Sequence, residues 1–319
     1  MSPLKKIGAF TAALAVAFGA AYGIGSAVGP VGADATENAA HSSSDGHGTA
    51  GEDNGKGEPG TSAALPGGLQ VSQDGYTLDL ATRTVPAGRE STLRLVIRDA
   101  NGDPVTAYRT EHDAQLHLII ASRELTTYRH LHPTRAADGT WSTPVDLPTA
   151  GGYRVFADFV PATEKEGLTL GADLAVTGAY PATALPAASR TATVDGYQVT
   201  LDGPLTPGRE NDLTFEVTRA GKPVTTLQPY LGAYGHLVAL RSGDLAYLHV
   251  HPHEEAEGSA TSGPEVAFAA NVPSTGTYRL FLDFKVDGKV RTAAFTVVAG
   301  TAAEPQAPSE THAEDGHGH

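Results

Sequence analysis

Apolar and polar residues alternate with a period of two along most of the chain between its two flanks. Residues 93–99, 213–218 and 278–284 show this alternation clearly and are rich in β-branched and aromatic side chains. Turn signals such as Asn101-Gly102-Asp103-Pro104 separate such segments at short intervals. Alternation broken by short turns is typical of antiparallel strands, so the pattern predicts an all-β protein. Before these strands, only residues 7–33 are expected to form an apolar helix.

The strand pattern occurs twice along the chain. The triplet Asp74-Gly75-Tyr76 corresponds to Asp195-Gly196-Tyr197, and the segment GYRVFADF at residues 152–159 corresponds to TYRLFLDF at residues 277–284. Each copy has about 110 residues, enough for the roughly seven strands of an immunoglobulin-like sandwich. A repeat of this length indicates a duplicated domain rather than a solenoid unit. We therefore expect two tandem antiparallel immunoglobulin-like β-sandwich domains. They are expected at residues 67–178 and 190–299.

Each copy also carries three histidines at the same spacing. Both read H-x12-H-x-H-P, and they lie 119 residues apart. Residues i and i+2 of a strand point to the same face, so each His-x-His pair presents two imidazoles together. A hairpin would bring the first histidine of the copy beside this pair. Because neutral imidazole suits borderline divalent metals, the pattern predicts one three-histidine metal site in each repeat. The candidate ligands are His117, His130 and His132 in the first repeat and His236, His249 and His251 in the second.

Asp158 and Asp283 are candidates for a fourth group in these sites. Each lies between an apolar residue and a phenylalanine in the last matching segment, where a buried carboxylate is costly unless it is paired. Three roles are open: a metal ligand, an acceptor for the second ring nitrogen of a ligating histidine, or an ion-pair partner for Arg154 or Arg279 four residues earlier. The first two roles are favoured over the third.

A structural role is the main alternative for the histidines, since an imidazole can hydrogen-bond a loop carbonyl without any metal. Tyr128 and Tyr247, next to the His-x-His pairs, are expected to be packing residues. His112 and His253 have no counterpart in the other copy and are expected in solvated loops.

The two flanks and the connector differ in composition from the repeats. Lys5 and Lys6 precede an uncharged run, which is typical of an export signal and also long enough to span a bilayer. Residues 1–33 are therefore expected to be a signal peptide or a membrane anchor, with the remainder outside the cytoplasm, either secreted or held at the cell surface. Residues 34–66 and the histidine-containing tail 300–319 are expected to be disordered, and residues 179–189 to link the repeats.

The amino-acid composition excludes several kinds of site and argues against one class of partner. The chain has no cysteine and one methionine, so disulfides, thiolate sites and blue-copper centres are excluded. The formal net charge of −14 argues against nucleic acid as a partner, because phosphate binding needs a cationic surface. The same charge is compatible with attracting cations.

The H-x12-H-x-H-P stretch followed by Tyr-Arg-[Val/Leu]-Phe-x-Asp-Phe resembles exported bacterial heavy-metal-binding proteins. Their immunoglobulin-like domains are similar to the YtkA-like and CopC-like copper-associated families. The resemblance covers both repeats and implies metal binding outside the cytoplasm through the six histidines. A CopC-like Cu(II) site commonly uses a histidine at the mature N-terminus, whereas Asp34 or a neighbour stands there in this chain, so that family's exact site does not carry over.

These observations predict an exported, non-enzymatic protein that binds Cu(II), or Zn(II) as second choice. It would sequester, buffer or deliver the metal at the cell surface, with a membrane metal transporter or chaperone as the expected partner. Two other classes stay open. One is a structural or adhesion β-sandwich protein with purely structural histidines, and the other is a copper enzyme of the superoxide dismutase-like type.

Overall fold

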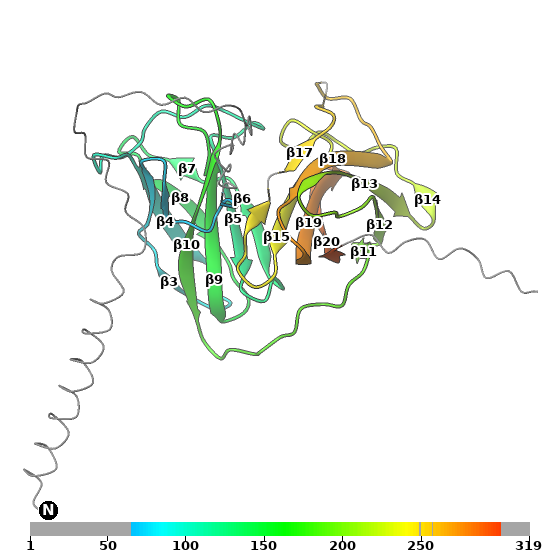
Figure 1. Cartoon of the computed structure of the whole chain (residues 1–319), viewed down its shortest axis with the longest axis horizontal. Coiled ribbons are helices and arrows are strands. Elements are labelled where there is room, and N and C mark those ends of the chain that lie inside the picture. The colour runs from blue at the N-terminus through cyan, green and yellow to red at the C-terminus, as the bar shows by residue number, and fades with distance from the viewer. Residues whose placement is uncertain (1–64, 249, 257, 301–319) are drawn as a thin grey trace, which may run out of the picture. The chain divides into compact units, whose positions relative to one another are not determined.

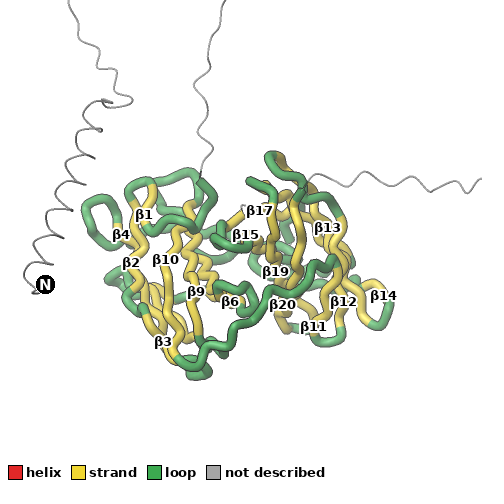
Figure 2. The backbone as a smooth tube through the Cα atoms, turned by 60° about the horizontal axis from the view of Figure 1, so that its bottom comes forward, coloured by secondary structure: helices red, strands yellow, loops and turns green. Residues whose placement is uncertain are grey.

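The computed structural model describes residues 65–248, 250–256 and 258–300 (Figure 1). All regular structure in this part of the chain is β-strand, joined by turns and loops (Figure 2). No helix among these residues is long and apolar enough to cross a membrane. The expected N-terminal helix and the histidine-containing tail lie outside the described residues.

The first repeat forms two sheets around one core. Its strands are β1 (Ser72–Gln73), β2 (Tyr76–Leu80), β3 (Thr84–Pro86), β4 (Ser91–Arg98), β5 (Leu116–Ser122), β6 (Tyr128–Leu131), β7 (Thr134–Arg135), β8 (Trp141–Val145), β9 (Gly151–Phe159) and β10 (Leu168–Thr177). One sheet has the order β1-β2-β4-β8-β7 and the other β3-β10-β9-β5-β6. All pairs are antiparallel except β3 with β10, which is parallel.

The second repeat has the same two-sheet arrangement. Its strands are β11 (Thr191–Val194), β12 (Tyr197–Asp202), β13 (Arg209–Arg219), β14 (Lys222–Pro223), β15 (His236–Arg241), β16 (Tyr247–Leu248), β17 (Val250–Pro252), β18 (Glu265–Val272), β19 (Gly276–Val286) and β20 (Lys289–Ala299). One sheet has the order β11-β12-β13-β18-β17, with β14 beside β13, and the other β16-β15-β19-β20. The prediction of two immunoglobulin-like β-sandwich repeats is therefore confirmed.

A third apolar cluster joins the two sandwiches, which belong to one compact unit. In β5, Leu118 and Ile120 point into the core of the first sandwich, while Ile119 points to the opposite face. That face packs against the matching face of the second sandwich, where the ring of Phe281 stacks on Tyr128 with centroids 4.1 Å apart. Both faces of β5, β9, β15 and β19 are consequently buried, which explains their near-continuous apolar sequence.

The chain just before β1 also contacts both repeats. The amide of Tyr247 donates to the carbonyl of Gly67 at 3.0 Å, and the amide of Gly68 donates to the carbonyl of Thr169 at 2.8 Å. This path needs a glycine at position 171, because a Cβ there would lie 2.0 Å from the Gly68 carbonyl oxygen. The segment therefore holds the edge of the second sandwich against β10 of the first.

The stacked pair at the junction gives a test of how strongly the repeats are coupled. Phe281→Ala should lower the free energy of unfolding by about 3 to 5 kcal/mol, because it opens a cavity between the sandwiches. Trp141, the one tryptophan of the chain, lies in the first repeat, so its fluorescence during urea unfolding reports on the repeat that was not mutated. Val298→Ala is the control, since this side chain is exposed. An unchanged Trp141 transition in Phe281→Ala would mean that the repeats unfold independently.

Candidate metal centre

Strand pairing places histidines at one end of the apolar junction. His117 in β5 lies opposite Asp158 in β9, and His236 in β15 lies opposite Asp283 in β19. The hairpin β5–β6 pairs Ile119 with His130, which brings His130 back beside His117 as the sequence predicted. Because His117 and Ile119 are two residues apart, both point to the junction rather than into the core of the first sandwich.

Three imidazoles converge there: His117 and His130 from the first repeat and His236 from the second. One nitrogen of each lies within 4.8 Å of the other two. Nδ1 of His117 is 3.1 Å from Nε2 of His130. The rings of His117 and His236 stack with centroids 5.3 Å apart. The His117 residue is only 6% exposed and the His130 side chain 3%.

Asp283 supports His130 from the opposite repeat. Its Oδ2 lies 2.9 Å from Nδ1 of His130, Oδ1 accepts a hydrogen bond from Thr292, and the Tyr128 hydroxyl donates at 3.5 Å. Burial raises the pKa of this carboxyl to about 7, against the lowering effect of its hydrogen bonds from Thr292 and Tyr128. Arg279 does not pair with it in the described structure, because that guanidinium donates to a backbone carbonyl and to Thr296.

The outer contact of His117 fixes its tautomer, and the tautomer of His130 follows from the charge of Asp283. Nε2 of His117 lies 3.1 Å from the carbonyl oxygen of Glu111, which can only accept, so this nitrogen carries the proton. With Asp283 ionised, Nδ1 of His130 donates to it in the same way. The two remaining nitrogens then face each other at 3.1 Å with lone pairs. Two such atoms repel unless a proton or a cation lies between them.

The spacing of these nitrogens suits a cation. Ligands bound to one ion at about 2.0–2.1 Å with angles of about 90–110° lie about 2.9–3.4 Å apart. Nδ1 of His236 is also buried and has no hydrogen-bond partner among the described residues. The arrangement therefore offers two nitrogens at ligand spacing and a third imidazole beside them.

Burial keeps all these imidazoles neutral. It lowers the pKa of His117 and lowers those of His130 and His236 well below the ordinary value, and the neighbouring histidines add to the effect at each. The pKa of His132 falls to about 4 for the same two reasons. Neutral imidazole is the form that ligates metals.

Two further histidines lie at the rim of this group. The exposed residue His132 has its ring centroid 4.9 Å from that of His130 and 5.1 Å from that of His117. His112 was expected in a solvated loop, but its ring lies 5.8 Å from that of His236. The sequence signal for His112 was its position just before β5. Its backbone there has a φ of 48°, and Leu231, in the turn before β15, has a φ of 57°.

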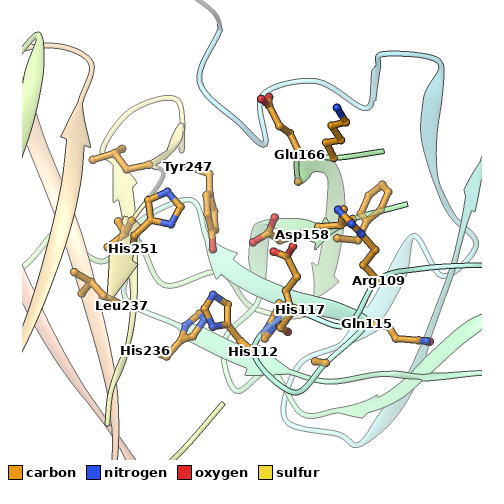
Figure 3. Close-up of a pocket in the computed structure, with 18 residues that line it drawn as sticks. Arg109, His112, Gln115, His117, Asp158, Glu166, His236, Leu237, Tyr247 and His251 are labelled. Carbon is orange, nitrogen blue, oxygen red and sulfur yellow. The ribbon is translucent and has the colours of Figure 1, made fainter. Parts of the chain in front are cut away.

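The remaining candidate ligands lie beside the three-histidine cluster or outside the described residues. Asp158 and His251 line a cleft of about 450 Å³ together with His117 and His236 (Figure 3). Thr169 donates to Asp158 at 3.0 Å. Arg154 donates to Asp173 and to backbone carbonyls. His249 lies outside the described residues.

The grouping differs from the expected one site per repeat. The three-histidine cluster takes two members from the first repeat and one from the second, and its carboxylate contact also crosses between repeats. The physical reason is the packing of the two inner sheets, which brings the histidine ends of β5 and β15 together. Sequence reasoning treated each sandwich by itself and therefore missed this sharing. Tyr128 and Tyr247 are packing residues of the junction, as expected.

Comparison with known structures finds weak similarities. A Salmonella alpha-2-macroglobulin reacted with methylamine matches with 15% identity and a TM-score of 0.25 over 74% of this chain and 15% of its own. Invasin, a bacterial integrin-binding protein, matches with 16% identity and a TM-score of 0.20 over 72% of this chain and 40% of its own. A marsupial T cell receptor matches with 13% identity and a TM-score of 0.23 over 70% of this chain and 100% of its own. None of these similarities is high enough to carry a function to this chain.

No curated protein matches the sequence. One protein family does, and it is described as "Domain of unknown function (DUF8832)". Its profile matches residues 70–175 and residues 192–301, so each sandwich corresponds to one copy of the domain. The chain therefore belongs to the DUF8832 family and carries two copies of its domain.

Proposed function

We propose that this protein binds one divalent metal ion tightly at the junction of its sandwiches, through His117, His130 and His236. The observation that carries the proposal is the pair of facing ring nitrogens 3.1 Å apart, with the Glu111 carbonyl at the other nitrogen of His117 and the Asp283 carboxyl group at the other nitrogen of His130. Imidazole ligands suit both Cu(II) and Zn(II), and the general affinity order of divalent ions favours Cu(II).

In this proposal the contacts around the ligands prepare the site. The Glu111 carbonyl and the Asp283 carboxylate each accept a hydrogen bond from the outer nitrogen of a ligating ring. Such partners hold the ring orientation and make the inner nitrogen a better donor to a metal. Because the ligand rings are buried and neutral, the ion meets little competition from protons at neutral pH.

The proposed role is that of an exported, non-enzymatic protein that sequesters, buffers or delivers the ion outside the cytoplasm. The basic and apolar start of the chain, the lack of cysteine and the net charge of −14 support this role. The sequence resemblance to YtkA-like and CopC-like proteins is consistent with it. For delivery, the proposed partner is a membrane metal transporter or chaperone.

A structural role for the histidines is the second candidate, and one observation favours it. With a pKa of about 7, Asp283 can be protonated and donate a hydrogen bond to Nδ1 of His130, and Nε2–H of His130 then donates to Nδ1 of His117. That chain of hydrogen bonds satisfies the same groups without an ion. The two candidates differ in what happens when metal is added.

Removing single ligands tests the shared site. The background chain carries His41, His47, His312, His317 and His319 replaced by Gln, which removes the histidines of the two flanks and keeps His249. In this background, His130→Gln and His236→Gln should each abolish tight Cu(II) or Zn(II) binding in isothermal titration, because each removes a ligand of the same ion. His253→Gln is the matched control, since this exposed histidine contacts Asp212 away from the cluster.

The stoichiometry separates a shared site from two independent ones. If each repeat had its own site, His130→Gln would leave one tight ion per chain. If the background chain with intact His117, His130 and His236 binds no metal tightly, the histidines are structural.

The carboxylate contact gives a graded test. Asp283→Asn keeps the side-chain shape but removes the charge that orients His130, so affinity for Zn(II) should fall by about 10- to 100-fold without being abolished. Asp212→Asn, at a mostly exposed carboxylate, should leave the affinity unchanged. Equal affinities for Asp283→Asn and its control would rule out this positioning role.

Acidification should destabilise the metal-free protein. The lowered pKa values of the buried histidines mean that the unfolded chain binds more protons below about pH 6.5, so their contribution to stability is lost as the pH falls from that value. Asp283 acts in the opposite direction, because its raised pKa favours proton binding in the folded state, but it is one group against several. The melting temperature in the presence of a chelator should therefore fall between pH 7 and pH 5.

His236→Gln provides the comparison for this pH series, since it removes one buried imidazole and should flatten the dependence. A melting temperature that rises on acidification, or a slope unchanged by the substitution, would contradict the assignment of buried neutral histidines.

A further inference from the structure

A further histidine lines the cleft next to the three-histidine cluster. His112, His117 and His236 all line this cleft of about 450 Å³, and they gather at one end of it (Figure 3). We propose that His112 is a transfer ligand, which binds the divalent ion transiently and passes it between the cleft and the buried centre. This inference rests on the proposed function, since it concerns how the ion enters and leaves that centre.

The ring of His112 lies within reach of an ion held by its neighbours. Its centroid is 5.8 Å from that of His236 and 6.2 Å from that of His117. A zinc–nitrogen bond of about 2.0–2.1 Å places a ring centroid about 3.2 Å from the ion, so two rings can share one ion up to a centroid separation of about 6.4 Å. Both separations fall below this limit, so the distances allow His112 to share an ion with either neighbour.

The same distances are too long for His112 to be a permanent ligand of the centre. Two imidazoles at the tetrahedral angle of one zinc ion have centroids about 5.2 Å apart. The three rings of the cluster lie near this value, with centroids 5.4, 5.3 and 4.7 Å apart. Both separations from His112 are longer. We therefore expect His112 to bind the ion only as it enters or leaves.

A tight turn presents this imidazole to the cleft. The amide of Glu111 donates to the carbonyl of Ala114 at 2.9 Å, and the amide of Ala114 donates back at 3.0 Å. The two central residues, His112 and Asp113, have φ of 48° and 59°, in the region where such turns favour glycine, asparagine or aspartate. The Glu111 carbonyl also accepts the hydrogen bond from His117. One turn therefore positions both a ligand of the centre and the proposed transfer ligand.

The second repeat has the corresponding turn without an imidazole. Tyr230 and Ala233 close it with the same pair of backbone hydrogen bonds. Its central residues, Leu231 and Gly232, have φ of 57° and 75°. The two turns lie against each other, since a Cβ on Gly232 would be 3.7 Å from the Cα of His112. Leu231 thus occupies the same backbone setting as His112 and provides a matched control.

The charge around His112 favours the arrival of a cation. The charged side chains that line the cleft are three carboxylates and two cationic groups: Glu111, Asp158, Glu166, Arg109 and Lys165. Asp113, next to His112, adds an exposed carboxylate at the turn. His112 is half-buried, whereas His117 is buried. A cation attracted by these carboxylates therefore meets a partly exposed imidazole before it reaches the buried ones.

A transfer ligand has a kinetic signature that a permanent ligand lacks. It lowers the barrier between cleft and centre in both directions. Its removal therefore slows uptake and release by the same factor and leaves their ratio, the Kd, unchanged. Removal of a permanent ligand would instead raise the Kd, because the bound state itself loses a bond to the ion.

The test compares His112→Gly with Leu231→Gly in the background chain. Each variant places glycine at a turn position with positive φ, where glycine is favoured, so both should fold. Stopped-flow mixing follows Zn(II) uptake with a fluorescent zinc indicator and Zn(II) release with an excess of a chromophoric chelator. In His112→Gly, uptake and release should both slow at least tenfold while the Kd changes by less than threefold. Leu231→Gly should match the background chain.

Chemical rescue separates ligation from a structural effect on the turn. Free imidazole is small enough to enter the cleft and can replace the missing ring. Its addition should speed uptake and release in His112→Gly by a larger factor than in Leu231→Gly. His112→Asn, whose side chain also suits this turn position, repeats the measurement in a second variant.

The outcomes distinguish this inference from the proposed function. Unchanged rates in His112→Gly, equal slowing in both glycine variants, or rescue that is the same in both overturns the transfer role while the tight centre stands. A Kd raised more than threefold with unchanged uptake would make His112 a permanent ligand, which also overturns the transfer role. If the background chain binds no Zn(II) tightly at equilibrium, the centre itself is wrong, and the transfer role falls with it.

Discussion

Burial of both faces of the two inner sheets is the constraint on which the rest of the structure depends. Each inner sheet packs one face into its own sandwich and the other against its counterpart, where Ile119, Phe156, Val238 and Phe281 form the shared cluster. The same packing buries polar groups at its edge, where burial is costly unless they are paired. His117 and His236, at the starts of β5 and β15, are shielded from solvent by the junction and not by either sandwich alone.

This burial determines the chemistry of the cluster. An imidazole removed from water loses its tendency to take up a proton, so the rings present lone pairs rather than charges. Each neutral ring also keeps one N–H, and here the acceptors for these N–H groups are the Glu111 carbonyl for His117 and, when ionised, the Asp283 carboxylate for His130. With the outer nitrogens occupied, the inner ones have only a proton or a cation to meet. Desolvation, which is costly for each group alone, is thus what makes the group of three suited to a cation.

Sequence alone was enough to predict the strands, the duplication and the hairpin that sets His130 beside His117. Local alternation and turn chemistry determine these features, and both can be read in a single repeat. The junction could not be derived that way, because it depends on how one repeat meets the other. One signal was present: β5 reads LHLIIAS and is buried at every position, whereas a strand with one solvated face would alternate. Read in that way, β5 and β19 predict a second buried face, whereas the contact of Asp283 with His130 depends on how the two faces dock.

The arrangement also explains why a duplicated motif need not give two equal sites. Two copies that pack through equivalent faces meet as the subunits of a two-fold dimer do, so each copy presents its aspartate toward the other. An ion ligated by His117 and His130 from one repeat and by His236 from the other would bind only when the repeats are docked. Its binding free energy would therefore add to that of the apolar cluster, since a ligand stabilises the state that binds it. Docking of the sandwiches and binding of the ion would then be thermodynamically coupled, so that each favours the other.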